Sequence, residues 1–123
     1  MIKLVFTLRR RESMSREEFQ RYWREEHAPL VARHADVLRI RRYVQVHARD
    51  TDLDEAVSAS RGSEPRFYDG VAELWWDSYE DLLAAYSTPE GLAAAGALLE
   101  DEARFIDLPR SPLWLGEENV VIG

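Results

Sequence analysis

The order of its patterned segments constrains this chain more than any other feature. Residues 2–8 alternate between apolar and more polar side chains, a period of two that predicts a half-buried strand. A helical pattern follows. Strands are then predicted at residues 38–48 and 69–76, and a second helical pattern leads to a last strand or strand pair at residues 113–115 and 120–122. The order β-α-β-β-α-β predicts an α+β fold of the split-βαβ, ferredoxin-like type with an antiparallel sheet.

Both helical patterns carry their own start signals. Ser15 and Glu18 form a capping box, in which each side chain satisfies the other's free backbone N–H. Pro29 is expected to interrupt this first helix, because it lacks an N–H and disfavours helical geometry at the preceding residue. The second pattern starts at Ser78 and restarts at Thr88. Its predicted apolar stripe consists of Leu92, Ala95, Leu99, Ala103 and Ile106.

A sheet of this kind is covered by helices on one face only, so the other face must bury its apolar side chains elsewhere. We expect Val44, Val46, Leu74 and Trp76 on that open face, with a second copy of the chain as its cover. The 123 residues leave no room for a second core, so residues 1–123 are predicted to form one domain. The expected assembly is therefore a homodimer.

Composition narrows the possible partners and compartments. The net charge is −7, which argues against a general nucleic-acid binder because the chain would repel phosphates. There is no cysteine, which excludes disulfides and thiolate chemistry. No apolar run approaches the roughly 20 residues that cross a bilayer, and the N-terminus is typical of a strand rather than a signal peptide. A soluble, cytoplasmic protein that binds neither membranes nor nucleic acids is the expectation.

His27 is the leading candidate for chemistry. It follows Phe19 and Trp23 on one face of the first helix, which should turn it towards the sheet. The helix dipole and the neighbouring Glu25 and Glu26 favour its charged form, and burial opposes that form. A histidine balanced in this way suits a general acid or base. The alternative is a structural histidine that caps helix carbonyls next to the proline.

Two predicted strands each carry polar and aromatic side chains on one face: Tyr43, Gln45 and His47 on the first, and Asp69, Glu73 and Trp75 on the second. If these faces coincide under the helices, they form a pocket with an acid–base pair and aromatic walls, because buried polar groups need partners. The alternative places Asp69 and His47 in solvent at strand ends and pairs Tyr43 with Glu73. Trp75 and Trp76 must point to opposite faces, so one can line a pocket and the other a dimer contact.

Several segments resemble the EthD domain family. The run from Met14 to Val31, with its Tyr-Trp and His-Ala-Pro-Leu elements, is similar to the family's entry helix. Residues 42–47, 68–75, 105–107 and 117–122 match further parts of the same pattern. Val46 stands where members often carry Asn, but it is expected to point away from the pocket. The resemblance implies a single EthD-like domain and a dimeric α+β barrel, in which two ferredoxin-like sheets close against each other.

The resemblance also implies two kinds of function. One is a cofactor-independent acid–base enzyme, such as a dehydratase, cyclase, decarboxylase or isomerase, that acts on a small aromatic, polyketide or lactone-like substrate. The other is a non-catalytic binding or accessory protein that supports a partner oxygenase. Haem degradation is disfavoured, because only three histidines are present. No metal-ligand spacing or glycine-rich nucleotide loop occurs, so no metal or cofactor is expected.

The candidate residues follow from these arguments. For an enzyme, His27 would move a proton with help from Glu73 or His47. The predicted substrate-binding residues are Tyr22, Trp23, Tyr43, Gln45, Asp69 and Trp75. Asp107, at a helix end where the dipole disfavours a carboxylate, is expected to pair with an early arginine for stability.

Overall fold

The computed structural model describes residues 1–123 and confirms the predicted ferredoxin-like α+β fold. The elements follow in the order β1 (Ile2–Leu8), α1 (Arg16–Tyr22), the π-helical turn η1 (Trp23–His27), α2 (Ala28–His34), β2 (Arg42–His47), α3 (Asp52–Ser60), β3 (Gly70–Trp76), α4 (Tyr79–Ala85), α5 (Pro89–Phe105), the 3-10 turn η2 (Leu108–Arg110) and β4 (Leu113–Glu117). The sheet order is β2-β3-β1-β4, and every neighbouring pair is antiparallel.

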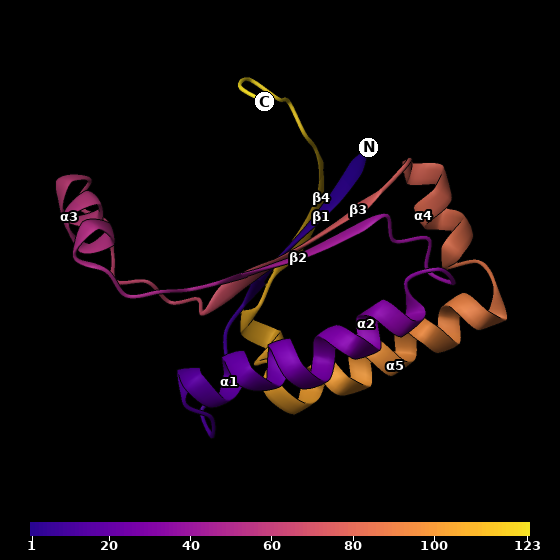
Figure 1. Ribbon diagram of the computed structural model, residues 1–123, viewed down its shortest axis with the longest axis horizontal. Helices are drawn as coiled ribbons and strands as arrows, with labels where there is room; N and C mark the ends of the chain where they lie inside the picture. Colours follow the sequence, from indigo (N-terminus) through magenta and orange to yellow (C-terminus); the bar gives the residue numbers. More distant parts are fainter.

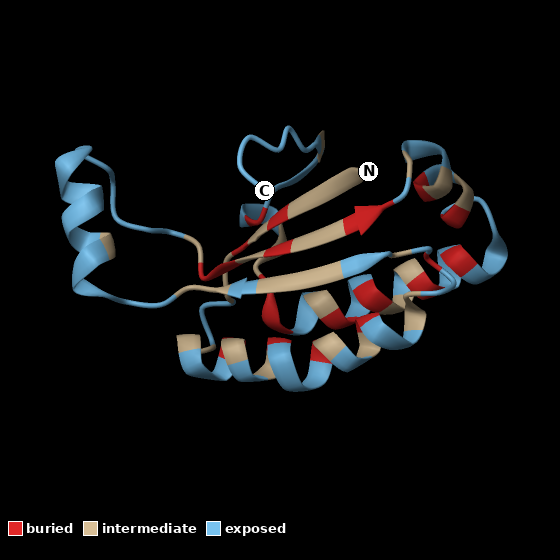
Figure 2. Ribbon diagram, turned by 45° about the horizontal axis from the view of Figure 1, so that its top comes forward, coloured by how far each residue is buried: buried red, intermediate tan, exposed pale blue.

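The helices gather on one side of the sheet. Figure 1 shows α1, α2 and α5 together below the sheet, with the C-terminal tail extending from its other side. The segment between β2 and β3 stands away from this body as an arm that carries α3, and no residue of α3 is buried (Figure 2). No helix in the structure combines the length and apolar composition that a membrane crossing requires.

The predicted helix starts are confirmed, but the predicted break at Pro29 is wrong. Ser15 and Glu18 form the capping box, and Ser78 and Thr88 cap α4 and α5. The helix that begins as α1 instead continues without a break through η1 into α2, which contains Pro29. The Ala28 N–H donates to the carbonyl of Trp23, five residues back, which is the wider π-helical bond. A π turn lets the chain stay helical up to Pro29, which has no N–H to give to the previous turn.

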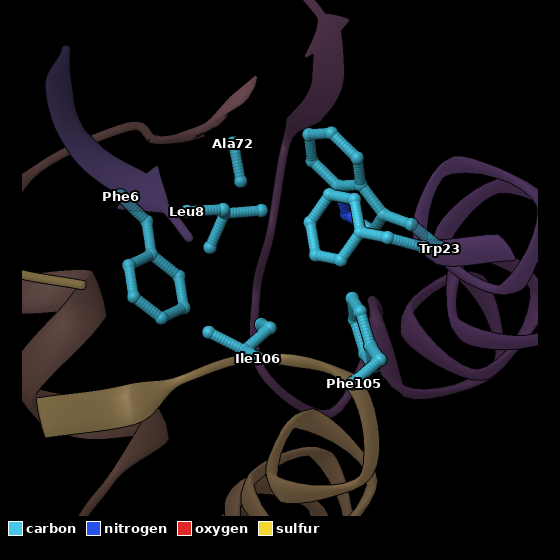
Figure 3. Close-up of a cluster of buried hydrophobic side chains, with 7 residues drawn as sticks. Phe6, Leu8, Trp23, Ala72, Phe105 and Ile106 are labelled. Carbon is cyan, nitrogen blue, oxygen red and sulfur yellow. The ribbon is translucent and has the colours of Figure 1, made fainter. Parts of the chain in front are cut away.

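The strand register decides which residues meet the helices. Two rows of paired residues cross β1, β3 and β2 on the side of the sheet that faces the helices. One row is Leu4, Leu74 and Tyr43, and the other is Phe6, Ala72 and Gln45. Leu74 and Trp76 are therefore on the helix-covered face, which corrects the expectation that they lie on the open face with Val44 and Val46. The main core packs between this face and the helices (Figure 3): Phe6, Leu8, Phe19, Trp23, Ala72, Phe105 and Ile106.

Three further expectations need correction. The buried stripe of α5 is rotated by one residue from the prediction and consists of Gly91, Ala94, Leu98, Asp101 and Phe105. Strand β2 begins only at Arg42, after a turn in which Arg39 has a φ of 57°. Residues 120–122 form no strand and are strongly exposed, because β4 ends at Glu117.

Candidate functional site

Two adjoining cavities lie between the sheet and α5. The inner one, of about 40 Å³, is lined by Phe6, Leu8, Trp23, His27, Val31, Tyr43, Ala72, Leu74, Leu98, Glu102 and Ile106. The outer one, of about 200 Å³, is lined by Leu4, Phe6, Leu38, Ile40, Leu74, Trp76, Tyr86, Ala95, Leu98, Leu99, Glu102 and Leu113. Phe6, Leu74, Leu98 and Glu102 line both, so the two cavities are neighbours with a common wall, and together they make up the candidate site. A cavity of about 150 Å³ already holds benzene, so the outer cavity fits a small ring compound, and the inner one leads from it towards His27.

His27 lies at the inner end of this site and is 5% exposed. The π turn η1 carries it, and its ring packs 5.0 Å from the Phe105 ring. Its Nδ1 is 2.7 Å from Oδ2 of Asp101 on α5. The prediction that His27 faces the sheet is confirmed, and its carboxylate partner comes from the other long helix.

Asp101 is nearly buried and receives three donors. Tyr22 donates its hydroxyl at 2.6 Å, His27 contributes Nδ1 and Arg104 donates from Nη1 at 2.9 Å. Burial alone would raise the pKa of Asp101, but these hydrogen bonds outweigh it and lower that pKa below its usual range. Asp101 is therefore a carboxylate that fixes the orientation of the His27 ring. Tyr22, predicted to contact substrate, contacts Asp101 instead.

The balance of effects on His27 favours the neutral ring. Burial lowers the pKa of His27 and outweighs Asp101, which acts in the opposite direction. Glu25 and Glu26, expected to favour the charged ring, are exposed to solvent, which screens their charges. A neutral His27 that donates from Nδ1 to Asp101 keeps Nε2 as a proton acceptor, and no protein group hydrogen-bonds that nitrogen. This arrangement is the resting form of a general base.

Glu102 is the second titratable group of the site. It follows Asp101 on α5 and lines both cavities. Burial, assisted by the charge of Asp101, raises the pKa of Glu102 from 4.5 to about 7. A carboxyl group with such a pKa is partly protonated near neutral pH and can act as a proton donor.

Three of the predicted polar residues share the helix side of β2 and contact one another. The Gln45 amide nitrogen donates to the Tyr43 hydroxyl at 2.9 Å and to the Trp23 carbonyl at 3.0 Å. Nε2 of His47 is 2.7 Å from Oε1 of Gln45, and the centroids of the tilted His47 and Trp23 rings are 4.3 Å apart. Tyr43 and Trp23 line the inner cavity, whereas His47 lies at the far end of this chain of contacts.

Glu73 and Trp75 do not join this group, because the register places them on the opposite face of the sheet. Glu73 pairs across the sheet with Val44 and forms an ion pair with Lys3. Lys3 also lies 4.5 Å over the Trp75 ring. The expectation that the two polar strand faces coincide is thus wrong, and the predicted pairing of Tyr43 with Glu73 is not formed. Trp76, not Trp75, lines the cavity.

Asp69 lies just before β3, lines neither cavity, and is 1% exposed. It accepts hydrogen bonds from the backbone and side chain of Arg10 and lies near Arg16. These contacts describe a buried ion-pair network at the end of the sheet. Arg9 and Arg10 therefore pair with Asp69 and not with Asp107, as was expected. Asp107 instead lies 3.7 Å from Arg110.

The sequence interpretation missed both carboxylates of α5. Asp101 lies three residues after Leu98 and four before Phe105, so it occupies a core position on the buried stripe. A carboxylate at such a position is the signal that could have revealed it, since a buried charge requires partners. The rotated stripe concealed this signal. The structure brings no three His, Asp or Glu side chains together in a metal-binding arrangement.

Comparisons with known proteins agree with this fold. The family model of the EthD domain matches residues 11–109. Among solved structures, an EthD family protein from Bacillus halodurans C-125 is similar over 97% of this chain and 99% of its own, with 21% identity and a TM-score of 0.65. No curated protein matches the sequence.

Two other solved structures are also similar. One is a dimeric protein of unknown function with a ferredoxin-like fold from Bacteroides fragilis NCTC 9343, at 14% identity and a TM-score of 0.58, with 95% of each chain covered. The other is a mutant of SnoaB, a cofactor-independent oxygenase from Streptomyces nogalater, at 17% identity and a TM-score of 0.57, with 98% of this chain and 95% of that chain covered.

Proposed function

This chain belongs to the EthD domain family, and from that premise we propose that it is a cofactor-independent enzyme that transfers protons on a small ring compound. One observation carries the proposal. A neutral histidine and a raised-pKa carboxyl group, His27 and Glu102, line one apolar site of suitable size. Pairs of titratable groups whose environments favour different protonation states are typical of acid–base catalysis.

The proposed first step is removal of a proton from the substrate by Nε2 of His27. The imidazolium that forms is stabilised by Asp101 at 2.7 Å, which holds the ring in place through Nδ1. Protonated Glu102 then gives a proton to a second atom of the same substrate. His27 ends protonated and Glu102 ionised, and the transfer of one proton between them through solvent restores the starting state. Dehydration and isomerisation of an uncharged ring both use steps of this kind.

The substrate class follows from the walls of the site. No Lys or Arg lines either cavity, and Glu102 is the only acidic group. A phosphate or carboxylate would therefore lose its hydration without a cationic partner. We propose an uncharged aromatic, polyketide-like or lactone-like ring as the substrate. SnoaB is described as a cofactor-independent oxygenase, so the assay below is run with and without oxygen.

The protein is proposed to act as a homodimer through the open face of its sheet. That face carries apolar side chains that no helix covers, among them Val46, 47% exposed, and Trp114, 52% exposed. A stable interface of standard size buries about 800 Å² per partner, which a four-stranded face can supply. Light scattering should show a dimer that Trp114→Lys dissociates. Leu53→Lys, on the exposed arm, should leave it intact, and a monomeric wild-type protein would exclude this assembly.

Hydrogen–deuterium exchange tests the chemistry before the natural substrate is known. Enolisable ring ketones such as 1-indanone and 2-tetralone are incubated in D2O, and NMR follows loss of the α-proton signal. Wild-type protein should accelerate exchange, and His27→Asn should lower this rate by about 100-fold or more. His34→Asn is the matched control, because His34 lies on α2 outside both cavities. An unchanged rate in His27→Asn would remove His27 from the mechanism.

The same experiment distinguishes the accessory role. A non-catalytic binding protein would bind these ketones saturably without accelerating exchange or turnover, in air or without oxygen. In that case a larger residue at Ala95, which lines the outer cavity, should abolish binding, whereas His27→Ala should not.

A further inference from the structure

The contacts of Gln45 determine the direction of the hydrogen bonds on β2. A backbone carbonyl only accepts, so the Gln45 side-chain atom 3.0 Å from the Trp23 carbonyl must be the amide nitrogen. The second N–H of that nitrogen points to the Tyr43 oxygen at 2.9 Å. An amide nitrogen has no free lone pair, so Tyr43 is the acceptor in this bond. The hydroxyl hydrogen of Tyr43 is therefore left without an acceptor in the protein.

His47 completes this directed chain. Since Oε1 of Gln45 only accepts, the hydrogen in its 2.7 Å contact with His47 belongs to Nε2 of the imidazole. Burial, and then the positive charge of Arg24, lowers the pKa of His47, so the ring stays neutral. Its Nδ1 is buried and has no hydrogen-bond partner. His47 thus donates a hydrogen bond to Gln45, and Gln45 donates one to Tyr43.

The end of this chain lies at the site. Tyr43 lines the inner cavity together with His27 and Glu102. Burial raises the pKa of Tyr43, so its hydroxyl keeps its hydrogen. The charge of Glu102 also raises the pKa of Tyr43, so Glu102 lies near the Tyr43 hydroxyl. No hydrogen bond joins the side chains of Glu102 and Tyr43. The free hydrogen is thus available to a ligand in the cavity.

We propose that the Tyr43 hydroxyl donates a hydrogen bond to an acceptor oxygen of the substrate, and that Gln45 and His47 position it for this. The substrate would then carry an uncharged carbonyl or similar oxygen near the atom from which His27 removes a proton. This inference rests on the proposed function only in assuming that the cavity holds the substrate. Tyr43 thereby selects ketone-like rings over hydrocarbon rings of the same size.

Two probes of equal size isolate this hydrogen bond. Acetophenone and ethylbenzene differ by a carbonyl in place of a methylene group, and NMR titration of the tryptophan indole N–H signals gives both dissociation constants. Wild-type protein should prefer acetophenone. Tyr43→Phe should lower that preference roughly tenfold, since it leaves the bound carbonyl without a donor. Tyr79→Phe, on α4 outside both cavities, should leave it unchanged.

Ethylbenzene also reports whether each variant keeps a folded cavity. Gln45→Leu should lose part of the preference while ethylbenzene binds as before, because Tyr43 is then free to turn away. An unchanged preference in Tyr43→Phe would overturn the proposal, as would failure of both probes to bind wild-type protein at millimolar concentration. A lost preference without any hydrogen–deuterium exchange would support the binding role of Tyr43 and refute the enzyme.

Discussion

Replacing Glu102 with glutamine should change how the stability of the fold depends on pH. The pKa of Glu102 rises from 4.5 to about 7 on folding, because its partly buried side chain loses hydration and lies beside the charge of Asp101. The folded chain therefore holds this proton more tightly than the unfolded chain. Between pH 4.5 and 7 the folded state binds more protons, so the free energy of unfolding falls as the pH rises.

The size of the effect follows from the same values. One pKa unit corresponds to about 1.4 kcal/mol, so the rise from 4.5 to about 7 sets an upper limit of about 3 kcal/mol. Glutamine has a similar shape but does not ionise. Glu102→Gln should thus be up to about 3 kcal/mol more stable relative to wild type at pH 8 than at pH 4. The contribution of wild-type Glu102 is complete below pH 4.5 and lost above pH 7.

Urea unfolding at fixed protein concentration, from pH 4 to pH 9, measures this difference. His27 and Asp101 titrate in both proteins, so the difference between the two curves isolates Glu102. Glu100→Gln removes the same charge from an exposed position of α5 and should give a nearly flat difference. A flat difference for Glu102→Gln as well would refute the raised pKa of Glu102 and, with it, the proposed proton donor.

Three other substitutions test the surrounding structure. Asp101→Asn should lower the pKa of His27 further, because the carboxylate is the group that raises it, and NMR titration of the ring would show this. Gly70→Ala should destabilise the fold by about 1–3 kcal/mol in urea unfolding, since its new methyl group would lie 2.5 Å from the Val46 carbonyl and 2.6 Å from the Trp23 ring. Asp69→Ala should cost about 1–3 kcal/mol in the same assay, because it leaves the backbone N–H and the guanidinium of Arg10 without their acceptor.

The order of the elements could be predicted from the sequence because its signals are local. Alternation in β1, the capping box at Ser15 and the caps at Ser78 and Thr88 each depend on residues within a few positions of one another. These signals fix the element order, and that order fixes the topology. The arm between β2 and β3 contains the helix α3. Its capping box at Thr51 was also a local signal, but it was overlooked.

The site was harder to predict because it depends on relations between distant elements. Sequence cannot state whether the face of β2 with Tyr43 coincides with the face of β3 with Glu73, since a shift of one residue in register reverses the answer. The structure pairs Tyr43 with Leu74 and so removes Glu73 from the cavity. Likewise, His27 and Asp101 are 74 positions apart and meet only when η1 packs against α5.

Asp101 and Glu102 show how one helix can supply two chemically different carboxyl groups. Successive residues of a helix point about 100° apart, so Asp101 faces η1 and Glu102 faces the cavity. Asp101 receives hydrogen bonds from Tyr22, His27 and Arg104 and stays ionised. Glu102 receives none and lies among apolar side chains, so it holds its proton to near neutral pH. Ionised Asp101 orients the base His27, while protonated Glu102 can serve as the acid. This difference in role follows from the angle of about 100° between successive residues of α5.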